Sequence, residues 1–183
     1  MLHPDLHPGL SPVGGSGVFA LRDIPMGTAL WGPCPDCEVR TAGEQGGLPP
    51  EVIAWLDEFG YRLDDRGLIL PCGGAHLLNH SCEAVALDHG LAAGIAVRDI
   101  RAGEEVTCDY RTFTADEPWE FTCRCGTPSC AGTVRTAADG AGEALTRTWR
   151  QRMEPALAAA RTLPQRIPPR PGSVLASPHA PAR

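Results

Sequence analysis

Two short stretches of the 183-residue chain carry most of the side chains that could do chemistry. One is Asn79-His80-Ser81-Cys82, which directly follows the apolar pair Leu77-Leu78. Because buried leucines would anchor this segment, its polar groups should lie at the edge of a core. The other stretch offers three closely spaced thiols, at Cys123, Cys125 and Cys130.

The spacing of the three late cysteines predicts a zinc site. Thiolates this close together suit tetrahedral zinc, and structural zinc sites are normally closed by four ligands. The fourth ligand must therefore come from a distant part of the chain, and Cys82 is the best candidate. In such a site the free energy of metal binding would add to the folding free energy of the region. The alternative is that the three thiols are unrelated.

Another pair of thiols occurs at Cys34 and Cys37, which are separated by two residues. A pair with this spacing can be half of a metal site or a redox pair. We favour a loop with two thiols, because no βαβ pattern surrounds the pair. Cys72 could join them as a third metal ligand, but the sequence offers no evident fourth.

The composition indicates an acidic globular protein with one core. Hydrophobic residues make up 43% of the chain and aromatic residues only 5%, so the core must be largely aliphatic. The formal net charge of −6 argues against direct nucleic-acid binding and favours basic partners. All 16 basic residues are arginine, so the chain has no lysine of its own to modify.

The sequence shows no pattern typical of a membrane or secreted protein. No apolar run approaches the ~18 residues that cross a bilayer. The first eight residues lack the basic and apolar regions of a secretory signal. Eight cysteines without such a signal indicate thiols or metal ligands rather than disulfides. We therefore expect a cytoplasmic protein that does not bind membranes.

Residues 49–60 have the clearest helical pattern, with proline at the start, an acid in the first turn and glycine at the end. Val52, Ile53, Leu56 and Phe59 recur at helical spacing. We expect this face of the helix to belong to the core.

Two segments, residues 18–31 and 94–106, share one pattern. Each has an apolar strand, then Arg-Asp-Ile, two further residues, a glycine and another strand. We interpret each segment as a β-hairpin whose glycine takes the positive-φ position of the turn. Two copies are too few for a repeat architecture, so we expect one small β domain.

The remaining elements are shorter or less strongly patterned. Residues 61–63 and 68–70 are typical of short strands on either side of a turn. A second helix is expected over residues 143–163, with Pro155 kinking or splitting it. Residues 164–183 are rich in Pro, Arg, Ala and Ser, and we expect a disordered tail.

Four motifs, taken in order, resemble the SET-domain family with a post-SET zinc segment, and the resemblance covers roughly residues 13–134. The motifs are Gly15-Ser16-Gly17-Val18-Phe19-Ala20, Asn79-His80-Ser81-Cys82, Gly103-Glu104-Glu105-Val106-Thr107-Cys108-Asp109-Tyr110 and the cysteine cluster. The resemblance implies a mainly β, β-clip-like fold of short sheets. It also implies a knot-like C-terminal threading in which the second and third motifs lie side by side. One or two short helices and a C-terminal helix would complete the fold.

The resemblance also implies an activity, which is the transfer of methyl groups from S-adenosylmethionine to a lysine of a protein substrate. The donor would contact the backbone of the glycine motif and the Asn-His pair, which correspond to Gly15, Ser16, Gly17, Asn79 and His80. Tyr110 would be the catalytic residue, orienting the acceptor amine through its hydroxyl group. The zinc ligands would be Cys82, Cys123, Cys125 and Cys130.

The resemblance implies a division of the chain into five parts. They are a flexible N-terminus (1–12), a SET domain (13–112, with an insert at about 45–70), a post-SET zinc segment (113–135), a C-terminal helical region (136–163) and a disordered tail (164–183).

The chain departs from the family pattern around the expected lysine channel. Cys108 stands where the family commonly has Phe or Tyr, so a wider channel would leave room for di- or trimethylation. Trp31 is the nearest aromatic residue to the position where a tyrosine often follows the first hairpin. Ala84 and Val85 replace the Pro-Asn that often follows the second motif.

Two other functions remain open from the sequence. A SET-like zinc module without catalytic activity could bind a partner or the donor, which the departures at Cys108, Trp31 and Ala84-Val85 would permit. A methyltransferase of a small amine would also fit an altered channel. The retention of Tyr110 together with both donor motifs favours protein-lysine methylation. A CxxC redox protein has little support.

Overall fold

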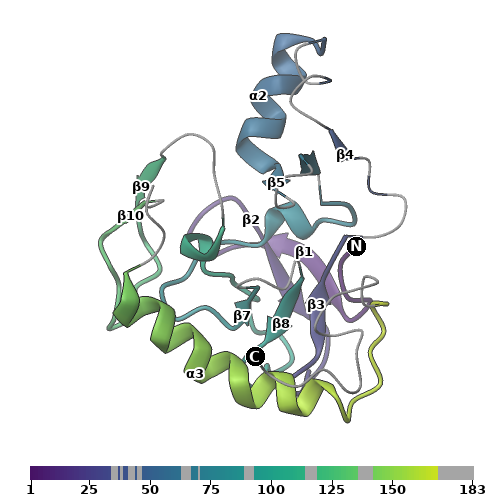
Figure 1. Cartoon of the computed structure of the whole chain (residues 1–183), viewed down its shortest axis with the longest axis vertical. Helices are drawn as coiled ribbons and strands as arrows, with labels where there is room; N and C mark the ends of the chain where they lie inside the picture. Colours follow the sequence, from purple (N-terminus) through teal and green to yellow (C-terminus); the bar gives the residue numbers. More distant parts are fainter. Residues whose placement is uncertain are drawn as a thin grey trace.

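The computed structural model describes residues 1–33, 37, 39–40, 44, 47–62, 67–69, 71–88, 93–113, 119–135 and 142–168 (Figure 1). Its strands form small antiparallel sheets, as expected for a mainly β fold. The expected knot-like threading stays a prediction. The elements, in chain order, are β1 (Leu6–Leu10), β2 (Ser16–Ala20), β3 (Ala29–Trp31), β4 (Val39–Arg40), α2 (Pro50–Phe59), β5 (Tyr61–Arg62), β6 (Leu68–Ile69), η2 (Ala75–Leu77), β7 (Ala86–Leu87), β8 (Gly94–Ala96), η3 (Tyr110–Thr112), β9 (Glu120–Thr122), β10 (Thr133–Arg135) and α3 (Glu143–Ala160).

The sheets are β1–β2, β3–β8–β7, β4–β6–β5 and β9–β10. The pairing of β5 with β6 confirms the two short strands predicted around residues 61–70. The central sheet, β3–β8–β7, carries the main core on one side, where Leu30, Ala86 and Ala96 are completely buried. This sheet is the platform on which the segments around Asn79 and Tyr110 are held.

The two similar segments do not form separate hairpins, which corrects our expectation. They pair with each other instead, through Phe19 with Glu105, Ile24 with Ile100, and Ala29 with Ile95. The residue numbers of each of these pairs add to 124, so one antiparallel register runs from Phe19 to Ala29, and it shifts by one residue where Trp31 pairs with Gly94. The shared pattern therefore reflects a long-range pairing, which a local interpretation of turns cannot reveal.

The two turns of this pairing stabilise each other in an equivalent way. The Asp99 carboxylate accepts a hydrogen bond from the Met26 N–H, and the Asp23 carboxylate accepts one from the Ala102 N–H, both at 2.8 Å. Both turn glycines have the predicted positive φ, as the values of 91° for Gly27 and 81° for Gly103 show.

Helix α3 covers the outer face of the central sheet (Figure 1). Trp149, Met153 and Ala156 pack with Leu87 and Ile95 in a second buried cluster. The predicted helix is confirmed, but Pro155 does not split it, because α3 runs from Glu143 to Ala160 as one element. None of the helices in the described residues is long and apolar enough to cross a bilayer.

Helix α2 is confirmed within one residue of its predicted start, but its predicted burial is wrong. Only Leu56 is buried, whereas Val52 is 37% and Trp55 45% exposed. The helix projects away from the central sheet (Figure 1), so most of its apolar face has no sheet to cover. Near its end the helix contacts His76, because the ring centroids of Phe59 and His76 lie 5.7 Å apart.

Both ends of the described chain are better packed than we expected. In the N-terminal segment, Leu6–Leu10 pairs with β2 and Leu6 is buried. In the expected tail, Ile167 is buried and the Gln165 amide bonds to the backbone of Ala29 and Gly27. The rest of the expected tail, residues 169–183, lies outside the described residues.

Candidate active site and metal centre

The glycine motif and the Asn79 segment meet at one hydrogen-bonded contact. The Asn79 amide donates to the Ser16 carbonyl oxygen at 2.9 Å and to Glu105 Oε1 at 2.8 Å. A Cβ at Gly17 would lie 2.3 Å from Glu105 Oε1, so a larger residue there would displace the Glu105 side chain from Asn79. Gly15 has a φ of 68°, which favours glycine. The structure therefore brings together Asn79 and the three residues of the glycine motif that we predicted to hold a donor.

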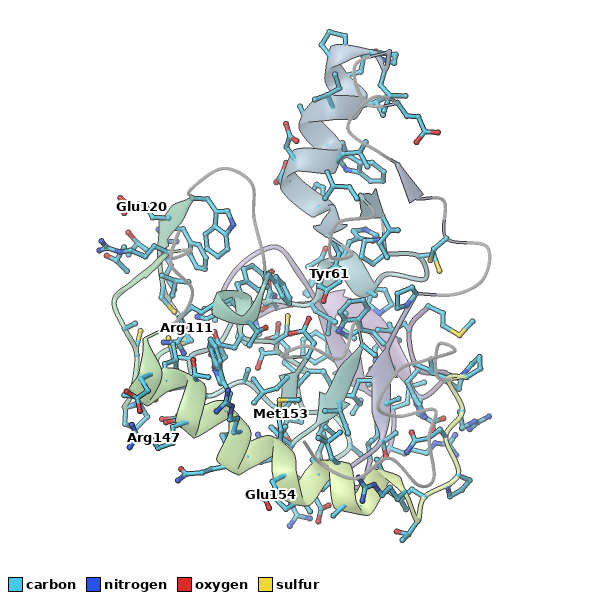
Figure 2. All side chains as sticks on the ribbon, in the orientation of Figure 1. Tyr61, Arg111, Glu120, Arg147, Met153 and Glu154 are labelled. Carbon is cyan, nitrogen blue, oxygen red and sulfur yellow. The ribbon has the colours of Figure 1, made fainter. Side chains whose placement is uncertain are left out.

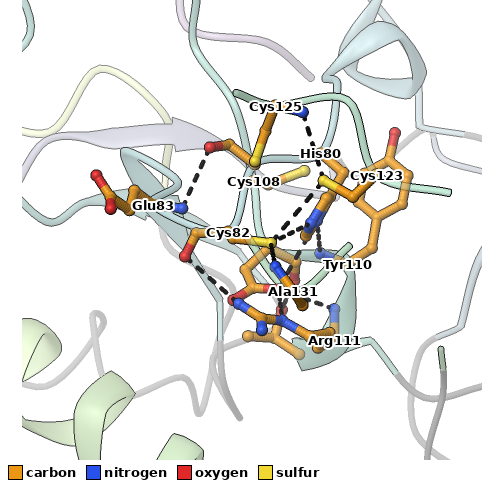
Figure 3. Close-up of polar contacts among 12 residues, drawn as sticks. His80, Cys82, Glu83, Cys108, Tyr110, Arg111, Cys123, Cys125 and Ala131 are labelled. Carbon is orange, nitrogen blue, oxygen red and sulfur yellow. Dashed lines mark hydrogen bonds and ion pairs between the residues drawn. The ribbon is translucent and has the colours of Figure 1, made fainter. Parts of the chain in front are cut away.

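The His80 side chain points into the protein (Figure 3). Its Nδ1 accepts a hydrogen bond from the Tyr110 backbone N–H at 3.1 Å, and its Nε2 lies 3.4 Å from Cys82 Sγ. Burial lowers the pKa of His80 to about 4 although the Asp109 carboxylate opposes this shift, so the ring is neutral at neutral pH. Because Nδ1 accepts, Nε2 carries the proton and directs it at the Cys82 sulfur. The side chain thus links the Tyr110 backbone to the cysteine cluster.

Tyr110 begins the 3₁₀ helix η3. A parallel bridge between His80 and Cys108 places the second and third motifs side by side, as expected. The Tyr110 hydroxyl donates to the Leu78 carbonyl oxygen at 2.7 Å. Burial raises the pKa of Tyr110 well above its ordinary value, so the phenol stays protonated at neutral pH.

Aromatic rings surround the phenol of Tyr110. Phe113 stacks on it with ring centroids 5.4 Å apart, and Trp119 and Phe121 approach it edge-on at 6.4 Å and 5.9 Å. Rings packed in this way exclude water and offer π faces that attract cations. Tyr110, Phe113 and Trp119 are all partly exposed, so the cluster reaches the surface.

The four cysteines predicted to bind zinc come together in space. Their sulfur atoms all lie within 4.8 Å of one another, and the Cys82 and Cys123 sulfurs are 3.9 Å apart. Four sulfurs around a tetrahedral zinc at about 2.3 Å would be about 3.8 Å from each other. The group consists of Cys82, Cys123, Cys125 and Cys130.

Backbone N–H groups point at the sulfurs of this cluster. The Ala131 N–H lies 3.3 Å from Cys82 Sγ, and the Gly132 N–H lies 3.5 Å from Cys130 Sγ. Burial raises the pKa of the Cys82 thiol, and the hydrogen bond from Ala131 opposes this effect. Because N–H donors stabilise thiolates and hold ligands in place, the donor set fits a soft, tetrahedral metal ion such as zinc.

Residues 15–111, just over half of the chain, match the family model of the SET domain. The chain belongs to the SET-domain family. The matched residues of this SET domain include the glycine motif, Asn79, His80 and Tyr110, whereas Cys123, Cys125 and Cys130 lie beyond them.

The relatives of this chain are much longer proteins. The chain is 40% identical over 67 residues to the histone-lysine N-methyltransferase ATX2 of Arabidopsis thaliana, an alignment that covers 33% of the chain and 6% of that protein. It is 36% identical over 139 residues to the histone-lysine N-methyltransferase trr of Drosophila melanogaster, an alignment that covers 66% of the chain and 5% of that protein. A crystal structure of a Plasmodium falciparum protein aligns with 57% of this chain and 96% of its own, at 23% identity and a TM-score of 0.41.

Sequence reasoning missed the role of Glu105. Its two carboxylate oxygens accept hydrogen bonds from Asn79 and from the Ser11 hydroxyl, at 2.8 Å and 3.0 Å. Glu105 therefore fixes Asn79 against the glycine motif of the SET domain. The sequence contains a signal, because the third motif has two adjacent acids, Glu104 and Glu105. Only the structure shows which of them contacts Asn79, since Glu104 pairs with Arg98.

The two residues expected to line the lysine channel are both buried. The Cys108 sulfur lies 3.8 Å from the carbonyl oxygens of Leu78 and Asn79, close to the acceptor of the Tyr110 hydroxyl. Trp31 contacts Tyr61 edge to face, with ring centroids 4.7 Å apart. Tyr61 and Phe113 were not predicted at this site, because Tyr61 lies in β5 and Phe113 follows η3, far apart in the sequence.

Asp109 ties the site to the C-terminal helix. Its carboxylate accepts hydrogen bonds from the Arg111 guanidinium at 2.7 Å and from the Trp149 indole at 3.0 Å. Arg111 also lies 3.4 Å from the Cys82 carbonyl oxygen. Asp109 therefore connects the segment that carries Tyr110 to α3.

The early pair of thiols can be followed only in part. Cys34 lies outside the described residues. The Cys37 sulfur lies 3.9 Å from that of Cys72, so the structure places Cys72 beside one member of the pair.

Proposed function

We propose that this protein is an S-adenosylmethionine-dependent methyltransferase that acts on a lysine side chain of a protein, with a structural zinc ion bound by the four-cysteine cluster. Membership of the SET-domain family and the names of its relatives support this function. The observation that carries the proposal is the convergence of three motifs. The Asn79 amide bonds to the glycine motif, while the segment that follows Asn79 bonds to Tyr110.

Each residue of the site has a role in this proposal. The bound donor supplies a methyl group on a positively charged sulfur. Gly15, Ser16 and Gly17 would hold the donor through backbone groups, and Asn79 keeps their turn in place. His80 acts through its backbone, because its side chain is already engaged with Tyr110 and Cys82.

The Tyr110 hydroxyl would orient the acceptor amine. Methyl transfer is an in-line displacement, so positioning contributes much of the rate acceleration. A lysine must lose its proton before it can attack, and the aromatic rings around Tyr110 favour the neutral amine by excluding water. Zinc would hold the cysteine segment, with the rings of Trp119 and Phe121, beside the Tyr110 phenol.

The substrate is expected to be a basic protein with an accessible lysine, since the chain carries a net charge of −6. Relatives named histone methyltransferases fit such a substrate. A cytoplasmic location, expected from the sequence, stays a prediction.

Tyr110→Phe tests the proposed function directly. Wild-type protein with labelled methyl donor and a lysate should label a protein band, and the variant should lose this label while keeping its melting temperature. The absence of lysine from the chain excludes self-labelling at lysine as a background. Label confined to small molecules would indicate a small-amine methyltransferase instead, and donor binding without any labelling would indicate a module that does not catalyse.

A further inference from the structure

One buried acid, Asp88, has no role in the function proposed above. It follows strand β7 directly and is only 3% exposed. Its Oδ2 accepts a hydrogen bond from the Tyr61 hydroxyl at 2.7 Å, and its Oδ1 contacts the Thr112 hydroxyl. Asp88 therefore joins the insert, through β5, to the 3₁₀ helix that begins with Tyr110.

Tyr61, which is labelled in Figure 2, belongs to a group of rings near Tyr110 that we call the aromatic wall and that consists of Tyr61, Phe113, Trp119 and Phe121. Its ring lies edge-on to Phe113, with centroids 5.3 Å apart, and Phe113 in turn stacks on Tyr110. Asp88 is thus separated from the proposed acceptor tyrosine by two ring contacts. A change in the position of the Tyr61 hydroxyl or of Asp88 would therefore alter the aromatic wall, which a lysine side chain would pass on its way to Tyr110.

The partners of Asp88 leave its charge uncompensated. In the part of the chain that the structure describes, Asp109 is paired with Arg111, whereas Asp88 contacts hydroxyl groups and no arginine. Burial raises the pKa of Asp88 to about 6, and the hydrogen bonds from Thr112 and Tyr61 oppose this shift. At neutral pH the carboxylate is therefore mostly ionised, and a cation nearby would stabilise it.

We propose that Asp88 is a positioning residue for the substrate, which fixes the Tyr61 hydroxyl in the aromatic wall and attracts the lysine ammonium into it. This inference rests on the proposed function for the identity of the ligand. The cation would be the side chain of an unmodified or methylated lysine. The negative charge of Asp88 and the faces of the surrounding rings would act together on the ammonium as it enters, before the amine loses its proton beside Tyr110.

Asp88→Asn separates the charge from the hydrogen bonds. The Thr112 hydroxyl has one hydrogen but lies within hydrogen-bond distance of both Asp88 Oδ1 and the Asp109 carbonyl oxygen. An asparagine can donate to Thr112, which then donates to the Asp109 carbonyl, while its own oxygen still accepts from Tyr61. The variant therefore keeps the network and removes only the charge.

The test compares two pools of nine-residue acetylated peptides, one with a fixed central lysine and one with norleucine, which lacks the ammonium group. Calorimetric titration of wild-type protein should show a preference for the lysine pool. Asp88→Asn should reduce this preference by about fivefold, the size of one partly screened charge interaction. Glu154→Gln, which removes an exposed charge on α3, is the matched control and should leave the preference unchanged.

Turnover measurements then separate this inference from the proposed function. For a lysine peptide that is methylated, Asp88→Asn should raise KM for the peptide, with little change in KM for the donor or in melting temperature. An unchanged lysine preference in Asp88→Asn would overturn the role of Asp88, as would a wild-type protein without such a preference. If wild-type protein prefers lysine peptides but methylates none, the proposed function fails while the role of Asp88 in binding stands.

Discussion

The Leu78 carbonyl oxygen brings Cys108 and Tyr110 to the same point, since the Tyr110 hydroxyl donates to it and the Cys108 sulfur lies 3.8 Å away. A phenylalanine at position 108 would fill space beside the proposed acceptor amine. We therefore expect Cys108→Phe to shift the products toward monomethyl-lysine, whereas wild-type protein also forms di- or trimethyl-lysine. Mass spectrometry of a peptide at exhaustive turnover measures this difference.

Cys108→Ser is the matched control, because it changes the sulfur without adding bulk. Overpacking a buried site costs about 1–3 kcal/mol, so the melting temperature of Cys108→Phe must be measured as well. A wild-type protein that stops at monomethyl-lysine would contradict the wide channel.

At the scale of elements, we expect the cysteine segment to depend on metal binding more than on packing. Strands β9 and β10 are three residues long, and Val134 is the completely buried aliphatic residue of their cluster. We expect Cys130→Ser to lower the bound zinc well below one ion per chain and to lower the melting temperature, because metal binding contributes to folding here. Metal analysis after dialysis, together with thermal unfolding, checks both.

Cys72→Ser is the control for this prediction, since Cys72 is exposed and outside the cluster. It should leave zinc content and stability unchanged. An equal loss of zinc in both variants would mean that the ion is bound elsewhere.

The helices and strands show which structural features could be predicted from patterns in the sequence. Helix α2 was predictable because proline and glycine mark its ends. Its exposure was not, since Val52 and Trp55 carry no sign that the helix stands away from the sheet. The glycine turns at Gly27 and Gly103 were also predicted, but their strands pair across the chain. Local patterns report turns and helix ends, whereas pairing partners depend on distant residues.

At the scale of the whole molecule, the sequence indicated those site residues whose side chains have one typical chemical role, such as the four cysteines. Sequence reasoning missed the residues whose role depends on which partners the fold brings to them. Glu105 and Asp88 are ordinary acids in the sequence, and their partners come from four separate segments. Tyr61 and Phe113 belong to the site only because the fold brings β5 against the residue that follows η3.

The stability of the whole molecule should record the burial of Asp88. Its pKa is raised from 3.8 to about 6 by burial, and the charged Asp109 adds to this effect. Between these two pH values the folded protein keeps a proton on Asp88 that the unfolded chain has lost. The free energy of unfolding therefore falls as pH rises through this window, by up to about 3 kcal/mol for this residue.

Asp88→Asn removes this contribution while the other titrating groups, including His80 and the cysteines, remain in both proteins. The difference in unfolding free energy between variant and wild type should therefore shift in favour of the variant from pH 4 to pH 6.5 and stay constant above it. Urea unfolding at a series of pH values measures this difference. Parallel pH profiles for the two proteins would mean that Asp88 titrates as an exposed acid does. Combined with a loss of lysine preference in the same variant, the expected shift would show that the protein gives up stability to keep a negative charge beside its acceptor site.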